Sequence, residues 1–168
     1  DLMIGPRNNN LKTLFIVDNP GDVVLADRNY YRDRVQTTIS YVAPEGVDYV
    51  ELLGNAPINA TGNSTANRLD GSMNAASNTL AGGIGNDTYI PGVGDVVLEN
   101  AGEGTDTVES AATYTLGANL ENLTLTGTAT VNGFGNALDN VLTGNGSSNV
   151  LGVDGGRDRL VGGAGNDS

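Results

Sequence analysis

The chain has 168 residues and a mass of 17.2 kDa, and its 20 acidic residues outnumber 8 basic ones, giving a formal net charge of −12. The absence of Cys and His excludes disulfides and the usual zinc, copper and haem sites, so a hard cation that binds oxygen is the expected partner. The charge disfavours nucleic acid and anionic lipid, and no apolar run is long enough for a membrane span.

Turn-forming residues dominate the composition. The chain contains 25 Gly and 21 Asn, only 38% hydrophobic residues and no Trp. Both Gly and Asn tolerate the left-handed backbone of tight turns, and so few large apolar side chains predict a thin core. Helical periodicity is nearly absent, so we expect an all-β protein.

Short strands are predicted in two similar series. β-branched and alternating residues mark the first series at 22–26, 32–43 and 48–54 and the second at 95–99, 105–116 and 121–127. From about residue 135, three-residue strands alternate with six-residue turns.

The two series reflect an internal duplication. Residues 22–72, shifted by 73 positions, align without a gap on residues 95–145, with 16 identical pairs among 51. A repeat of fixed period predicts a stacked fold, so we expect one β-solenoid over 1–168 with repeat units at approximately 15–88 and 89–168. Since the chain starts without Met and stops inside a repeat, we expect it to be a segment of a larger protein.

A nine-residue period lies within the longer one. A polar residue recurs every nine positions at Asn140, Asn149, Asp158 and Asp167. A leucine stands two positions after each of the first three, at Leu142, Leu151 and Leu160. A chain that turns every nine residues and points one leucine inward per turn predicts a flattened parallel β-roll with those leucines inside.

Glycine-rich turns carry the clearest motif. Residues 82–90 and 162–168 follow the pattern G-G-x-G-x-D, a degenerate copy lies at 153–161, and Asn-containing versions lie at 135–143 and 144–152. With these turns the chain resembles the RTX (repeats-in-toxin) family, whose haemolysin-type repeats bind calcium in a β-roll. Glycines let the backbone curl and aim carbonyl oxygens at one point, and an Asp adds the charge that Ca2+ prefers.

The resemblance implies a calcium ion between each turn and the next turn but one. This pairs Asp167 with Asn149, Asp158 with Asn140, and Asp87 with the turn ending at Asn67. The predicted metal ligands are Asn67, Gly82, Gly83, Ile84, Gly85, Asp87, Asn140, Asn149, Asp154, Gly156, Asp158, Gly162, Gly163, Ala164, Gly165 and Asp167. Because each pair contains an Asn instead of a second Asp, the asparagines, including Asn78, can alternatively form a hydrogen-bonded ladder along the stack.

Other polar positions receive weaker assignments. Six acidic residues do not lie in glycine-rich turns: Asp22, Asp33, Asp48, Asp95, Asp106 and Glu121. Their side chains are expected to accept hydrogen bonds from nearby backbone N–H groups. A calcium role is the alternative for Asp95 or Asp106. The Arg- and Tyr-rich segment 27–34 is either a solvated loop, a contact with a flanking domain or a site for an acidic sugar.

Catalysis is not expected. Serine or threonine hydrolysis needs a His or Lys partner, and Lys12 is the only lysine. No pair of carboxylates stands out for glycoside chemistry.

We therefore expect a non-enzymatic, calcium-binding segment of a secreted protein. The RTX resemblance implies type I secretion in an unfolded state and folding on Ca2+ outside the cell, with calcium ions and the flanking domains of the parent as partners. The alternative is a structural spacer, or a module that binds polysaccharide or a surface, in an adhesin, a surface-layer protein or a secreted polysaccharide-active enzyme.

Overall fold

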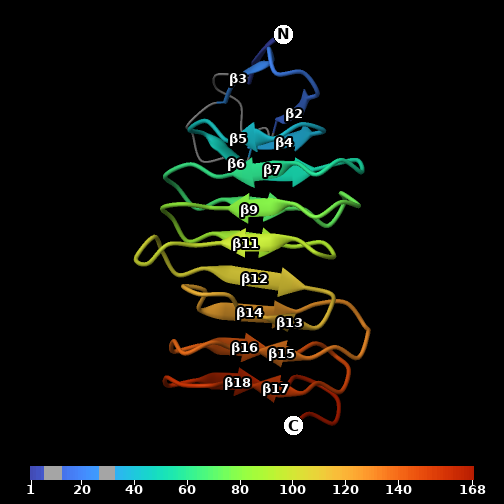
Figure 1. Ribbon diagram of the computed structural model, residues 1–168, viewed down its shortest axis with the longest axis vertical. Helices are drawn as coiled ribbons and strands as arrows, with labels where there is room; N and C mark the ends of the chain where they lie inside the picture. The colour runs from blue at the N-terminus through green and yellow to red at the C-terminus, as the bar shows by residue number, and fades with distance from the viewer. Residues whose placement is uncertain (6–12, 27–32) are drawn as a thin grey trace. The chain divides into compact units, whose positions relative to one another are not determined.

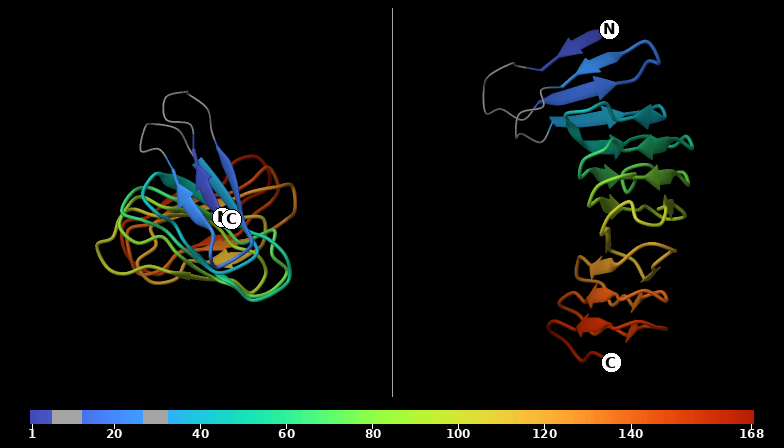
Figure 2. Two further views of the ribbon diagram at one scale, coloured as in Figure 1. Left: turned by 90° about the horizontal axis from the view of Figure 1, so that it is seen from above. Right: turned by 90° about the vertical axis from the view of Figure 1, so that its left-hand side faces the viewer.

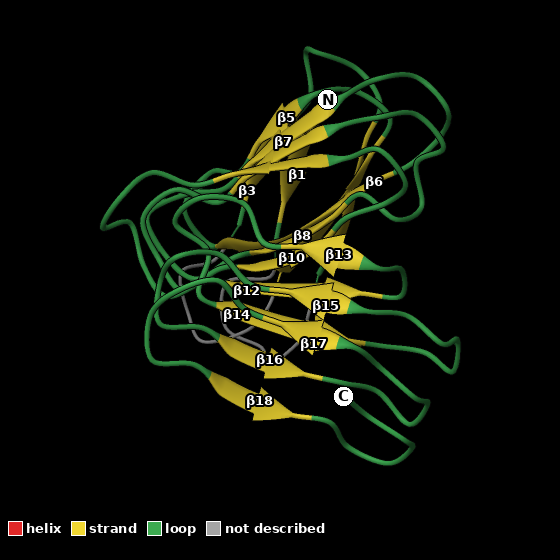
Figure 3. Ribbon diagram, turned by 60° about the horizontal axis from the view of Figure 1, so that its bottom comes forward, coloured by secondary structure: helices red, strands yellow, loops and turns green. Residues whose placement is uncertain are grey.

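The computed structural model describes residues 1–5, 13–26 and 33–168. These residues form short strands joined by turns and loops, and none of them is helical (Figure 3). The strands pair in parallel, so the predicted all-β, parallel β-solenoid class is confirmed. The chain divides into two compact units, Asp1–Leu98 and Glu99–Ser168, which we describe separately. The predicted repeat boundary near residue 88 stays a prediction.

In the first unit, consecutive strands alternate between two parallel sheets (Figure 1). One sheet contains, in order, β2 (Leu14–Val17), β4 (Asp33–Thr37), β6 (Val47–Leu52), β8 (Arg68–Asp70) and β10 (Thr88–Ile90). The other contains β5 (Tyr41–Val42), β7 (Asn59–Thr61), β9 (Thr79–Ala81) and β11 (Val96–Leu98). A separate pair joins β1 (Leu2–Ile4) to β3 (Val23–Leu25).

The second unit repeats this alternation. One sheet contains β12 (Thr107–Ser110), β14 (Asn122–Leu125), β16 (Val141–Thr143) and β18 (Arg159–Val161). The other contains β13 (Tyr114–Thr115), β15 (Gly133–Phe134) and β17 (Leu151–Gly152). The stacking of strands within each unit can be followed in the side view of Figure 2.

The strand registers confirm the predicted periods. Val141 pairs with Arg159, 18 positions later, so one coil consists of two nine-residue halves. Strands β4, β6 and β8, shifted by 73 positions, fall on β12, β14 and β16, and the pairing of Val50 with Leu69 recurs as that of Leu123 with Leu142. The duplication in the sequence is therefore a duplication of strands and of their registers.

The predicted long strands 32–43 and 105–116 are each broken by a corner. At the first corner the Thr37 hydroxyl donates to the carbonyl of Ile39 at 2.9 Å and accepts from its N–H at 3.1 Å. Ser110 and Ala112 make the same two contacts at 3.0 and 3.2 Å. A hydroxyl that satisfies the backbone two residues on competes with the sheet ladder and bends the chain, which the β-branched pattern alone does not reveal.

Each unit has a thin core to which both of its sheets contribute. Inward residues from successive strands stand in register in a buried row: Phe15, Val35, Val50, Leu69 and Tyr89 in the first unit, and Val108, Leu123 and Leu142 in the second. Leu151 is buried as predicted, but Leu160 is 46% exposed. Its strand, β18, is the outermost of its sheet among the described residues.

The row of leucines provides a matched test of the core. Replacing fully buried Leu142 with Ala should lower the free energy of unfolding by about 2–4 kcal/mol, because the narrow stack cannot close the cavity. Leu160 pairs with Leu142 from β18, and Leu160→Ala should lower the free energy of unfolding by less than about 1 kcal/mol. Denaturant unfolding in calcium measures both, and equal losses would contradict the proposed core.

Candidate functional site

The two intact glycine turns adopt backbone conformations that favour glycine. Gly83 and Gly85 have φ of 83° and 146°, and Gly163 and Gly165 have φ of 93° and 117°. A Cβ on Gly85 would lie 2.7 Å from the carbonyl carbon of Thr65, and one on Gly165 would lie 2.8 Å from that of Ser147. Left-handed backbone and the close approach of the preceding coil therefore both require glycine here.

The three Asp–Asn pairs that the sequence analysis joined are neighbours in the structure. Asp87 Oδ1 accepts a hydrogen bond from the backbone N–H of Asn67 at 2.6 Å. Asp158 Oδ1 accepts from Asn140, and Asp167 Oδ1 from Asn149, each at 2.9 Å. The turns therefore stack with the predicted spacing, and a calcium ion shared by each pair stays a prediction.

The remaining predicted ligands occupy different surroundings. Asp87 is buried, Asp158 is half-buried, and Asp154 and Asp167 are exposed. The side chain of Ile84 points to solvent, so that residue and its counterpart Ala164 can offer a metal only their backbone carbonyls. In the degenerate turn, Gly156 has φ of 88°, and a Cβ on it would lie 2.4 Å from the carbonyl oxygen of Leu138.

The asparagines of the predicted pairs form a hydrogen-bonded ladder. In Asn67, Asn140 and Asn149, Oδ1 accepts the N–H of the residue four positions earlier at 2.7–3.0 Å. Their Nδ2 atoms donate to the carbonyls of Val47, Leu120 and Val131 in the preceding coil at 2.6–3.1 Å. All three side chains are buried, so these bonds satisfy polar groups that water does not reach.

A second set of asparagines, which the sequence analysis missed, joins the turns more directly. We call Asn63, Asn74, Asn136 and Asn145 the staple asparagines. In each, Nδ2 donates to two carbonyl oxygens of the turn one coil earlier at 2.6–3.2 Å. In each, Oδ1 also accepts the N–H two residues later at 2.8–3.0 Å. The available signal was the Asn-x-x-x-Asn spacing at 63/67, 74/78, 136/140 and 145/149.

Several acidic side chains satisfy backbone groups, as predicted. Asp95 accepts from the N–H of Gly92 at 2.8 Å and of Asn78 at 2.7 Å. Its counterpart Asp22 accepts from Asp18 and Asn19, and Asp33 accepts from Thr13 at 3.0 Å. These carboxylates stabilise turns.

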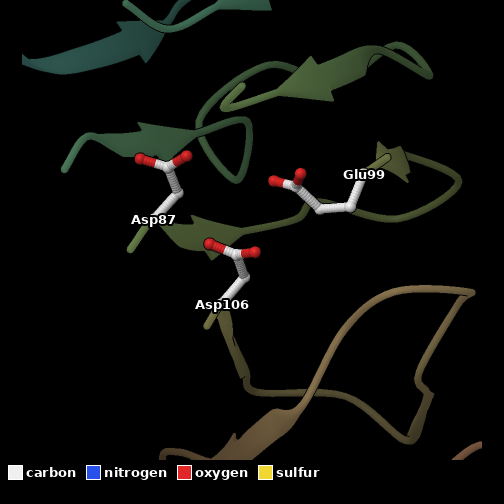
Figure 4. A group of neighbouring side chains, drawn as sticks. All are labelled: Asp87, Glu99 and Asp106. Carbon is white, nitrogen blue, oxygen red and sulfur yellow. The ribbon is translucent and has the colours of Figure 1, made fainter. Parts of the chain in front are cut away.

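Among the described residues of the second unit, the acidic side chains of Glu99 and Asp106 lie close together and can contribute ligands to a metal ion (Figure 4). In the second unit, carboxylate oxygens of Glu99 and Asp106 lie within 4.8 Å of each other, and Asp106 is buried. Carboxylates of this kind suit a hard divalent cation such as Ca2+. From the sequence, a calcium role was an alternative for Asp106 but was not predicted for Glu99, which has Ala26 at the equivalent position of the first copy.

The chain is similar to one curated protein over much of its length. It is 34% identical over 113 residues to the endo-1,3-1,4-beta-glycanase ExsH of Rhizobium meliloti (strain 1021). The match covers 66% of this chain and 23% of the length of that glycanase. No family model matches the chain. No solved structure matches it. Within the described residues, no helix has the length and hydropathy needed to cross a membrane.

The staple asparagines can be tested at Asn145. Its Nδ2 donates to Thr126 at 3.2 Å and Ala129 at 2.8 Å, so Asn145→Ala leaves two carbonyls without this donor. We expect the free energy of unfolding to fall by about 2–3 kcal/mol in denaturant titrations. Asn166→Ala, an exposed position in the following turn, is the control and should change stability by less than about 0.5 kcal/mol. A loss no larger than that of the control would contradict the role of the staple.

Proposed function

We propose that this chain is a calcium-dependent folding segment of a larger extracellular protein. It resembles RTX repeats in its turns, and its parallel β-solenoid fits a β-roll. In this proposal the segment performs no catalysis. Its function is to remain unfolded where calcium is scarce and to fold where calcium is abundant.

The observation that carries the proposal is an exchange of residues between equivalent turns. Gly83 stands where the preceding coil has Asn63, and Gly163 stands where it has Asn145. The glycines therefore lack the amide that joins coils elsewhere. The carbonyl oxygen of Asn145 lies 2.7 Å from the position of a Cβ on Gly163, so it faces the space of the missing side chain. A cation in such a turn would replace the amide as the group that binds carbonyl oxygens.

The second change in these turns supplies charge. Asp87 and Asp167 stand where the preceding coils have Asn67 and Asn149. The amide turns need no counter-charge, whereas a turn that holds Ca2+ gains from a carboxylate. Glycine and aspartate therefore occur together in the turns without a staple asparagine, which supports calcium as their ligand.

Charge also explains how calcium would control folding. The net charge is −12, and the core of each unit is thin. Stacking the carboxylates without a cation costs repulsion, so we expect the segment to be largely disordered in chelator. Binding Ca2+ to the folded state alone would convert binding energy into folding energy.

Calcium titration monitored by far-UV circular dichroism tests this function. The wild type should lack β-structure in excess chelator and gain it cooperatively with calcium. Asp87→Asn/Asp167→Asn should raise the midpoint of the titration about tenfold or more, because each turn loses its charged ligand.

Asp139→Asn is the matched control, because it removes an exposed carboxylate outside the intact glycine turns and should leave the midpoint unchanged. A wild type that is fully folded in chelator, or a midpoint that the double variant does not move, would contradict the proposal.

A second candidate function is a polysaccharide-related role, as an accessory surface beside an attached enzyme or in a cell-surface protein. The 34% identity to an endo-1,3-1,4-beta-glycanase favours it. The two roles are compatible, because a segment that folds on calcium can also present a binding face.

A further inference from the structure

The outer surface of the first unit carries an unusual group of side chains. Strands β4, β6 and β8 point six polar residues outward, which we call the Arg–Tyr face: Arg34, Gln36, Tyr49, Glu51, Arg68 and Asp70. They stand in two rows in register across the strands. Tyr49 pairs with Arg34 on one side and Arg68 on the other, and Glu51 pairs with Gln36 and Asp70.

The members of this face contact one another closely. Arg34 lies over the Tyr49 ring, 4.8 Å from its centroid, and Arg68 lies 5.8 Å from it, within the range of cation–π attraction. Arg34 also forms an ion pair with Glu51. The carboxylate of Glu51 accepts a further hydrogen bond from the side-chain amide of Gln36. The Tyr49 hydroxyl donates to Asp70 at 2.8 Å. The face is thus held in one arrangement before any ligand arrives.

The scaffold does not need these residues. In the second unit, the same registers on β12, β14 and β16 hold Thr107, Asn122 and Val141 in the first row. The second row there holds Glu109, Thr124 and Thr143. Ordinary strand residues therefore build the same sheet, and an ion pair in place of such residues is weak evidence for a gain in stability. The Arg–Tyr face requires an explanation other than folding.

The depth of the charged groups indicates the sign of the ligand. The side chain of Glu51 is 8% exposed and Asp70 is also 8% exposed, whereas that of Arg34 is 37% exposed. The carboxylates are thus more deeply placed than the Arg34 side chain, and Arg68 is half-buried, so both arginines are accessible in part from the outer surface. Arg34 and Arg68 are the only basic side chains among the described residues of the first unit. A planar guanidinium fixed in this way suits a carboxylate ligand.

We propose that the Arg–Tyr face binds a polysaccharide that carries carboxylate groups, with Arg34 and Arg68 donating to those groups. This inference deepens the polysaccharide-related role proposed above and rests on it. Arg34 and Arg68 lie two strands apart, about 9–10 Å at the backbone, so successive acidic groups on an extended glycan can reach both.

Charge and hydrogen bonding favour a glycan over other anions. The net charge of −12 repels the dense phosphates of nucleic acid, whereas a glycan spaces its carboxylates with neutral hydroxyls. Burial and the bond to Asp70 raise the pKa of Tyr49 to about 12, so its hydroxyl stays protonated at neutral pH and keeps Asp70 in place. Gln36 adds an amide that can bond sugar hydroxyls.

The test compares the full chain in calcium with a variant that has the surface of the second unit. Arg34→Thr/Tyr49→Asn/Glu51→Thr/Arg68→Val/Asp70→Thr leaves the net charge at −12, because two basic and two acidic residues are removed together. Calorimetry with oligogalacturonate at fixed free calcium should show at least about a tenfold loss of affinity, while circular dichroism stays unchanged. Arg34→Lys/Arg68→Lys keeps the charge but not the planar donors. Its affinity for oligogalacturonate should lie between the affinities of the wild type and the five-residue variant.

Two controls separate the possible failures. Arg157→Thr/Arg159→Thr removes two exposed arginines of the second unit and should bind like the wild type. If the wild type binds no saccharide, acidic or neutral, the polysaccharide role and the site both fail. If the wild type binds and the five-residue variant binds equally well, only the site is wrong. Equal affinity for neutral mixed-linkage β-glucan, polyglutamate or single-stranded DNA would overturn the assignment to a carboxylate-bearing glycan.

Discussion

The contact on which each unit depends is the bond from a side-chain amide to the backbone carbonyls of the turn beneath it. The apolar core of each unit is thin, and a tight turn leaves carbonyl oxygens that need donors. The staple asparagines supply one donor group to two such oxygens at every turn they occupy. Where glycine replaces them, the proposed calcium ion would bind these carbonyl oxygens in place of the amide.

Much of the fold follows from the sequence, because a period is visible without knowledge of any contact. The shift of 73 residues and the nine-residue spacing gave the solenoid, its registers and the partners of Asp87, Asp158 and Asp167. The corner at Thr37 was missed because β-branched residues continue through it, and the corner at Ser110 because strand-forming residues resume directly after it. The staple asparagines were missed because their role depends on carbonyl oxygens of the preceding coil, which the spacing alone does not identify. The Arg–Tyr face depends on neighbours across strands 15 to 19 residues apart, which no local pattern displays.

The two copies show how a duplicated scaffold separates its inside from its outside. In one register, the inward positions of β6, β8, β14 and β16 hold Val50, Leu69, Leu123 and Leu142. Outward positions in the same strands hold Tyr, Glu, Arg and Asp in the first unit and Asn, Thr and Val in the second. A parallel stack tolerates this divergence because outward side chains contribute little to the core. New surface chemistry can therefore arise in one copy while the other keeps a plain surface.

The pairing of each strand with the strand one coil away has a consequence for how the chain gains its structure. Partners are separated by only 14 to 21 residues, as in Asp33 with Val47 and Leu2 with Val23. The loop entropy lost at each step is small and nearly constant, so a coil can form as soon as its predecessor exists. Such a chain can acquire order progressively, coil by coil, with each formed coil serving as the template for the next.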